Sequence, residues 1–187
     1  MGSEKMLSTR NRQERHTLGT LPETRIRFVR HGEVSTDFNG TFYGGRNVPL
    51  SPEGEKKSVE LADQLATDPI DLVVTSPLDR TVFLAKSLAE KARAPWVVEE
   101  NLRELDRGAW STKTLEEIET DDPGAIARHV ADPESGNGPE GEPESVFCHR
   151  VWSTVDRLAA EHPGAHLVAV AHAHVIRAVM RRLEDWS

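Results

Sequence analysis

Short apolar runs alternate with longer amphipathic segments along the chain, a pattern that predicts strands separated by helices. Residues 25–30 (RIRFVR) alternate polar and apolar side chains, which is typical of a β-strand with one buried face. Three further short apolar runs predict strands at residues 71–75, 96–98 and 166–170. Each pair of successive strands is separated by enough residues for a crossover helix, so the pattern favours parallel pairing.

Apolar residues at helical spacing predict helices between and after these strands. The first begins at Ser51-Pro52-Glu53, because serine is a good N-cap, proline suits the first helical position and an acid suits the first turn. Its expected buried face consists of Val59, Leu61, Ala62, Leu65 and Ala66. The other predicted helices span residues 78–91, 145–161 and 175–183. The helix at 145–161 is expected to bury Val151, Trp152, Val155, Leu158 and Ala159.

The remaining segments are expected to be irregular. Residues 108–137 predict a loop with short helices, and residues 135–143 predict a surface loop because glycine, proline and glutamate dominate them. Residues 1–24 are polar and charged, and we expect a mobile N-terminal arm there. The sequence therefore predicts one α/β domain over residues 25–187, with a three-layer architecture in which helices flank a mostly parallel sheet.

Composition excludes several classes of protein. The net charge is −8, and residues 99–144 carry fourteen acidic against four basic side chains, so no basic track for nucleic acid is expected. No apolar run is long enough for a membrane-spanning helix. The single cysteine, Cys148, excludes an internal disulfide, and the N-terminal residues lack the apolar segment of a secretory signal. We therefore expect a cytoplasmic protein without membrane or nucleic-acid partners.

Ionisable side chains follow the predicted strands at their carboxyl ends, where active sites of parallel sheets lie. The strands at 25–30, 71–75 and 166–170 lead into Arg30-His31-Gly32-Glu33, Ser76-Pro77-Leu78-Asp79-Arg80 and Ala171-His172-Ala173-His174. A fourth segment, Leu102-Arg103-Glu104-Leu105-Asp106-Arg107, follows the strand at 96–98. Arginine binds two phosphate oxygens with its planar fork, a neutral imidazole is a nucleophile, and a carboxyl group can protonate a leaving oxygen. This set of side chains indicates phosphoryl transfer.

The ordered motifs resemble the histidine phosphatase superfamily, which has the phosphoglycerate mutase-like fold. The resemblance covers residues 26 to about 183 and rests on RHGE at 30–33, GTFYG at 40–44, VPLSPEG at 48–54, TSPLDRT at 75–81, LRELDRGAW at 102–110, GE at 141–142 followed by RV at 150–151, and AH at 171–172 with VIR at 175–177.

The resemblance implies a role for each matched residue. His31 would attack phosphorus and become a phosphohistidine that water later hydrolyses. Arg30, Arg80 and His172 would form the phosphate pocket, with His172 protonated or donating a hydrogen bond. Glu104 would be the acid for the leaving alcohol and then the base for water; Asp106 in the same loop competes for this role. The family needs no metal or other cofactor, although His172, His174 and His31 could also be interpreted as a metal site.

Substrate contacts are expected from residues around this set. Gly32 would let the backbone approach phosphate closely. Tyr43 is an apolar candidate for the leaving group, and Ala173 and His174 stand where the family usually has two glycines. The family usually has asparagine where this chain has Asp37, so Asn39 or Ser35 would supply that phosphate contact.

The sequence thus predicts a metal-independent phosphomonoester hydrolase that acts on a small phosphorylated metabolite through His31. A phosphoglycerate-type mutase is one alternative, but the strongly acidic middle segment disfavours it; a non-catalytic module that binds phosphate esters is the other. Only fifteen residues follow His172, whereas family members usually continue through another strand, so an uncovered sheet edge and association into a homodimer are expected.

Overall fold

The computed structural model describes residues 23–135 and 137–184, and its strands form one parallel sheet in the order β1-β4-β2-β3. The strands are β1 (Arg25–Arg30), β2 (Leu72–Thr75), β3 (Trp96–Val98) and β4 (His166–Ala171). Both central strands, β2 and β4, are mostly apolar and are buried except for the partly buried His166, because helices cover them on both faces.

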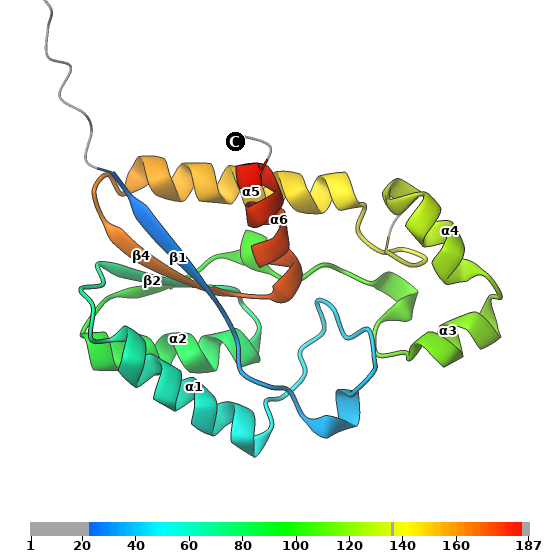
Figure 1. Ribbon diagram of the computed structural model, residues 1–187, viewed down its shortest axis with the longest axis horizontal. Coiled ribbons are helices and arrows are strands. Elements are labelled where there is room, and N and C mark those ends of the chain that lie inside the picture. Colours follow the sequence, from blue (N-terminus) through cyan, green and yellow to red (C-terminus); the bar gives the residue numbers. More distant parts are fainter. Residues whose placement is uncertain (1–22, 136, 185–187) are drawn as a thin grey trace, which may run out of the picture.

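Helices form the outer two layers, as Figure 1 shows. On one face lie α1 (Pro52–Leu65) and α2 (Asp79–Ala92), and on the other lie α5 (Glu144–Glu161) and α6 (Ala173–Glu184). Two short helices, α3 (Leu115–Asp121) and α4 (Ala125–Ala131), lie beyond the carboxyl ends of the strands. The predicted three-layer α/β fold is confirmed.

The core has one apolar cluster on each face of the sheet, because neighbouring residues of a strand point to opposite faces. Val73 and Val168 pack with the apolar faces of α1 and α2, whereas Val74 and Ala169 pack with α5 and α6. Together the two clusters hold the carboxyl ends of β1, β2 and β4 side by side, which positions the side chains that follow these strands.

Strand β1 lies at one edge of the described sheet, beside an apolar groove of about 660 Å³ between β1, α5 and α6. The groove is lined by Ile26, Phe28, Trp152 and Ile176 among others. The edge agrees with the expectation of an uncovered strand, and a homodimer stays a prediction that size-exclusion chromatography would test. No helix among the described residues is both long and apolar enough to cross a membrane.

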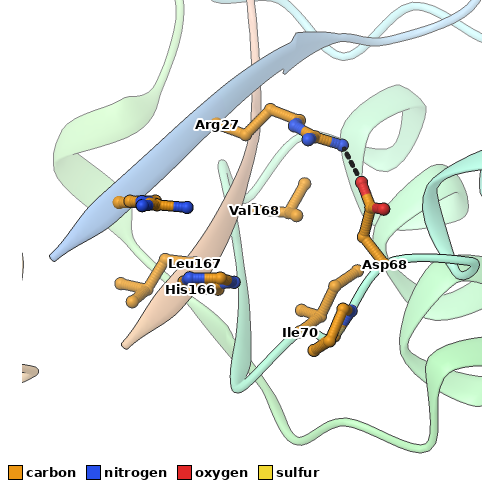
Figure 2. Close-up of a pocket in the computed structure, with 8 residues that line it drawn as sticks. Arg27, Asp68, Ile70, His166, Leu167 and Val168 are labelled. Atoms are coloured by element: carbon orange, nitrogen blue, oxygen red, sulfur yellow. Dashed lines mark hydrogen bonds and ion pairs between the residues drawn. The ribbon is translucent and has the colours of Figure 1, made fainter. Parts of the chain in front are cut away.

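A smaller hollow of about 260 Å³ lies at the amino ends of β1 and β4, away from the ionisable residues of the strand ends (Figure 2). Arg27 spans its rim and pairs with Asp68 at 2.9 Å, and both side chains are more than half exposed. An ion pair this exposed contributes at most about 1 kcal/mol to stability.

Several local expectations were wrong. In α1 the buried positions include Gly54 and Ser58, because this face of the helix packs against the loop after β1, whereas Val59 is 37% exposed. In α5, Thr154 is buried, while Val155 and Ala159 are only half-buried. The predicted surface loop 135–143 also contains a buried residue, Asn137. The predicted arm, 1–24, lies outside the described residues except for Glu23 and Thr24.

Candidate active site

The parallel register brings three strand ends to one edge of the sheet. Arg30 of β1 pairs with Ala171 of β4, and Thr75 of β2 pairs with Val170 of β4. The residues that follow directly, His31, Ser76 and His172, are therefore neighbours. The rings of His31 and His172 lie 5.2 Å apart, centroid to centroid, at an interplanar angle of 59°.

His31 is held in one tautomer. Its Nδ1 lies 2.6 Å from the carbonyl oxygen of Gly32, and since a carbonyl only accepts, Nδ1 carries the proton. The other nitrogen, Nε2, accepts a hydrogen bond from Nε of Arg80 at 3.2 Å. The lone pair of Nε2 therefore points toward Arg80.

The surroundings of His31 keep the imidazole neutral. Burial, which leaves the residue 7% exposed, lowers the pKa of His31 to about 4, and the charges of Arg80 and Arg30 act in the same direction. The hydrogen bond to Gly32 and the charge of Glu104 oppose this shift without reversing it. At neutral pH the ring has the unprotonated nitrogen that a nucleophile requires.

Arg80 is buried in the first turn of α2, with 1% exposure, and all three of its nitrogens are engaged. Besides the contact with His31, Nη1 donates to the carbonyl of Arg46 at 2.7 Å and Nη2 to that of Gly44 at 2.8 Å. The Tyr43 ring lies 5.2 Å from its Cζ. Burial lowers the pKa of Arg80 to about 10, so the guanidinium stays charged at neutral pH. The residue thus joins α2 to the glycine-rich loop and to His31.

His172 is fully buried and pairs with Ser76. Its Nε2 lies 2.7 Å from Ser76 Oγ, while its Nδ1 is buried with no hydrogen-bond partner in the described part of the chain. Burial lowers the pKa of His172 to about 2, so the ring is uncharged at neutral pH. Of the two expectations for this residue, a protonated ring is therefore disfavoured, and hydrogen-bond donation is compatible with the geometry.

Glu104 is buried, with 6% exposure, whereas Asp106 is exposed and accepts a hydrogen bond from the backbone N–H of Gly108. Oε1 of Glu104 accepts from the N–H of Leu105 at 3.0 Å, and Oε2 lies 3.3 Å from both the N–H and Nδ1 of His174. Burial raises the pKa of Glu104, but the contact with His174, the nearby His172 and the N–H of Leu105 lower it more strongly, and the net pKa is lowered to about 2. At neutral pH the carboxyl group is therefore ionised, and its role as an acid beside a bound phosphate stays a prediction.

A cavity of about 450 Å³ opens beside His31. Its lining includes four of the other expected site residues, which are Arg30, Gly32, Asn39 and Tyr43. Arg80, His172 and Glu104 are not among the lining residues, but the charge of Glu104 affects the pKa of His31, Arg80 and His172. Asp37 is exposed and accepts a hydrogen bond from Ser35 at 3.1 Å, so it does not line the cavity.

Packing within the protein also requires a glycine at position 32, besides the expected close approach of a phosphate. A Cβ there would lie 2.4 Å from the carbonyl oxygen of Gly54 and 2.5 Å from Oγ of Ser58. The loop after β1 therefore packs against the first turns of α1, and its backbone carries the carbonyl that orients His31.

The last two expected contacts lie in the first turn of α6. Ala173 and His174 were predicted to precede a helix at 175, but α6 already begins at Ala173. Ala173 is half-buried, and His174 contacts Glu104 rather than the cavity lining.

Sequence reasoning missed three residues of this site: Ser76, Arg107 and Asn137. Ser76 contacts His172, and Arg107 joins Asn137 to His174. Each contact links residues at least 30 positions apart, so no local spacing could have indicated it. The only signal was the position of Ser76 directly after a strand. Within the described residues, no group of three or more histidine, cysteine, aspartate or glutamate side chains is arranged to hold a metal ion.

Comparison with known proteins agrees with the fold and the residue set. The sequence profile of the histidine phosphatase superfamily (branch 1) matches residues 26–187. Phosphoserine phosphatase 1 of Hydrogenobacter thermophilus is 29% identical over 151 residues, which cover 81% of this chain and 72% of that protein. A probable phosphoglycerate mutase of Yersinia enterocolitica is 26% identical, covering 83% and 72%.

A solved structure is similar as well. Mycobacterial glucosyl-3-phosphoglycerate phosphatase superposes with a TM-score of 0.76 at 27% identity, covering 83% of this chain and 77% of that one. The chain belongs to the histidine phosphatase superfamily, and the neutral, buried His31 with Arg80 on its Nε2 lies within the matched residues. The predictions of the family, and of a phosphoric monoester hydrolase as the class of enzyme, are confirmed.

Proposed function

We propose that the protein hydrolyses a small phosphomonoester in two steps, with His31 as the nucleophile. The observation that carries this proposal is the pair of contacts on the His31 ring, which fix the proton on Nδ1 and direct the lone pair of Nε2 toward Arg80. A phosphate bound there would take over the hydrogen bond from Arg80, which places phosphorus within reach of Nε2.

In the first step, a bond forms between His31 Nε2 and phosphorus while the bond from phosphorus to the ester oxygen breaks. Arg30 and Arg80 would offset the negative charge on the transferred group, and His172 would donate from Nδ1 to one of its oxygens when Ser76 donates to Nε2. The leaving oxygen takes a proton from Glu104 and departs as an alcohol.

In the second step, water attacks phosphorus and the bond to Nε2 breaks, which releases inorganic phosphate and restores the neutral ring. Glu104 would accept the proton of the attacking water. Because the lowered pKa of Glu104 leaves it ionised at neutral pH, its proton for the first step has to arrive with the substrate. A bound phosphate beside the carboxylate favours such uptake, since two negative groups at close range disfavour full ionisation of both.

The substrate class is proposed at the level of a small phosphorylated metabolite. The relatives named above act on phosphoserine and on glucosyl-3-phosphoglycerate, both of which are small phosphomonoesters. Asn39, Tyr43 and Thr41 line the cavity beside His31, so they would contact the substrate. A panel of phosphorylated metabolites would identify the preferred leaving group.

The test is turnover of para-nitrophenyl phosphate by the full chain. We expect hydrolysis that survives a chelator, is inhibited by vanadate and is lost in His31→Ala, and we expect mass spectrometry at alkaline pH to detect a phosphoryl group on His31. Turnover in His31→Ala at the wild-type rate would refute the proposal. A wild-type protein that binds phosphate esters without turnover would indicate a binding module.

A mutase is the second candidate, because one relative is named a probable phosphoglycerate mutase. The phosphoryl group of the same phosphohistidine would then be transferred to a second position of the substrate instead of to water. Incubation with 3-phosphoglycerate separates the two, since a mutase yields the 2-phospho isomer whereas a phosphatase yields inorganic phosphate.

A further inference from the structure

A chain of hydrogen bonds leads from a buried asparagine to the carboxyl group of Glu104. Asn137 Oδ1 accepts from Nη1 of Arg107 at 2.8 Å, and Nη2 of Arg107 lies 3.0 Å from Nε2 of His174. Nδ1 of His174 in turn lies 3.3 Å from Oε2 of Glu104. The chain connects the loop before α5, the segment after β3 and the first turn of α6.

The chemistry of arginine sets the direction of every proton along this chain. A guanidinium only donates, so Nε2 of His174 accepts and the ring proton is on Nδ1, which donates to Glu104. His174 therefore donates to Glu104 through Nδ1. With the N–H groups of Leu105 and His174, the carboxylate accepts three hydrogen bonds.

Arg107 is largely buried rather than exposed on the surface of the protein. It is only 9% exposed, Asn137 is 2% exposed, and the Phe42 ring lies 5.4 Å from its Cζ. Asn137 is fixed by a second hydrogen bond, from its Nδ2 to the carbonyl of Glu142 at 2.7 Å. Burial lowers the pKa of Arg107, and the charge of Glu104 opposes this shift. A single orientation of the guanidinium, and through it of the His174 ring, is thereby imposed.

We propose that His174, oriented by Arg107, is a positioning residue that holds Glu104 as an oriented carboxylate. The inference rests on the proposed role of Glu104 as acid and base. It explains why the proton of the first step has to enter with the substrate, and why the same carboxyl group is ready to accept a proton from water in the second step.

Other charged or titratable groups also face this pair, and the test has to separate them from His174. Around Glu104 they are His31 after β1, Arg80 of α2, Arg107 of its own segment and His172 after β4. Around Arg107 they are Glu144 of α5 and Arg177 of α6. None of these groups changes in a variant at position 174, so a shift caused by that variant reports on His174.

The experiment is a pH titration of the Glu104 carboxyl carbon by NMR on the full chain labelled with 13C-glutamate, with the resonance assigned by Glu104→Gln. In the wild type the pKa of Glu104 is lowered to about 2, so we expect no midpoint above about pH 3. In His174→Ala the midpoint should rise by about one to two pH units, which is the effect of losing one hydrogen bond to a charged group. His174→Asn keeps a side-chain N–H near the position of Nδ1 and should restore most of the wild-type behaviour.

A midpoint in His174→Ala equal to that of the wild type, or one that His174→Asn fails to restore, would overturn the proposal. Arg107→Gln is a second test that leaves position 174 unchanged. Without the guanidinium as a fixed donor the His174 ring is free to change tautomer, so we expect a smaller upward shift of the Glu104 midpoint. An unchanged Glu104 in that variant would remove Arg107 from the proposal.

Kinetics on para-nitrophenyl phosphate complete the test. The acidic limb of kcat/KM should move to higher pH in His174→Ala and return in His174→Asn, while the ionisation of the substrate is common to all variants. Because the NMR titration needs no substrate, it separates the two proposals. Absence of turnover would refute the proposed function, whereas an unshifted Glu104 in an active enzyme would refute only the role of His174.

Discussion

Arg80 contacts the nucleophilic ring and the glycine-rich loop with one planar group, so its geometry matters as much as its charge. Its Nε meets His31, and its two Nη atoms meet the carbonyls of Gly44 and Arg46. A guanidinium has two further N–H groups for a phosphate oxygen. A lysine ammonium has three donors in all and cannot reproduce this fork.

We therefore expect Arg80→Lys to lower kcat/KM for para-nitrophenyl phosphate by roughly 10² to 10³-fold, as loss of a donor to the transition state does elsewhere. Arg27→Lys at the opposite end of the sheet is the matched control, because Arg27 forms an exposed ion pair and should leave kcat/KM unchanged. Full activity in Arg80→Lys would show that charge alone suffices there.

At the scale of elements, the loop after β1 and the start of α1 fit together through two glycines. A Cβ on Gly32 would lie 2.4 Å from the Gly54 carbonyl oxygen, and a Cβ on Gly54 would lie 2.0 Å from that of Glu33. The predicted N-cap fixes the same turn, since Ser51 Oγ accepts from the N–H of Gly54 at 2.9 Å. The position of α1 therefore sets the position of the carbonyl that orients His31.

Replacing Gly32 by alanine should push α1 and this loop apart. We expect Gly32→Ala to lower the free energy of unfolding by about 1–3 kcal/mol, the usual cost of overpacking, and to reduce kcat because the His31 ring loses its fixed orientation. Urea denaturation and steady-state kinetics measure the two effects. Wild-type values for both would mean that the helix can move without cost.

The bounds of the strands and helices show how much of the fold the sequence could predict. Alternation of side chains predicted β1 and a short apolar run predicted β3, both with the observed bounds, and the serine–proline pair predicted the start of α1. The start of α6 was missed by two residues, since Ala171-His172-Ala173 has no capping signal. The expected residues around His31 could be selected from ordered motifs, but Ser76, Arg107 and Asn137 act through contacts between distant segments. Such contacts depend on packing, which no local pattern encodes.

The whole molecule buries two histidines beside arginines, and this arrangement makes its stability depend on pH. The pKa of His31 is lowered to about 4 and that of His172 to about 2, whereas an unfolded histidine titrates near 6.5. Below about pH 6.5 the unfolded chain therefore binds protons that the folded protein does not bind. The free energy of unfolding is highest above pH 6.5 and decreases as the pH falls toward 4. Glu104 adds to the loss below about 4.5, because its pKa is also lowered in the folded state.

Each histidine contributes a slope of up to about 1.4 kcal/mol per pH unit in this window. We expect urea denaturation between pH 7.5 and 4.5 to give a steep decrease for the wild type and roughly half that slope for His172→Gln, which removes one of the two groups. His149→Gln, on the exposed side of α5, should keep the wild-type slope. A wild-type stability that stays constant over this range would mean that the buried rings accept protons inside the fold, and the neutral nucleophile inferred for His31 would then lose its physical basis.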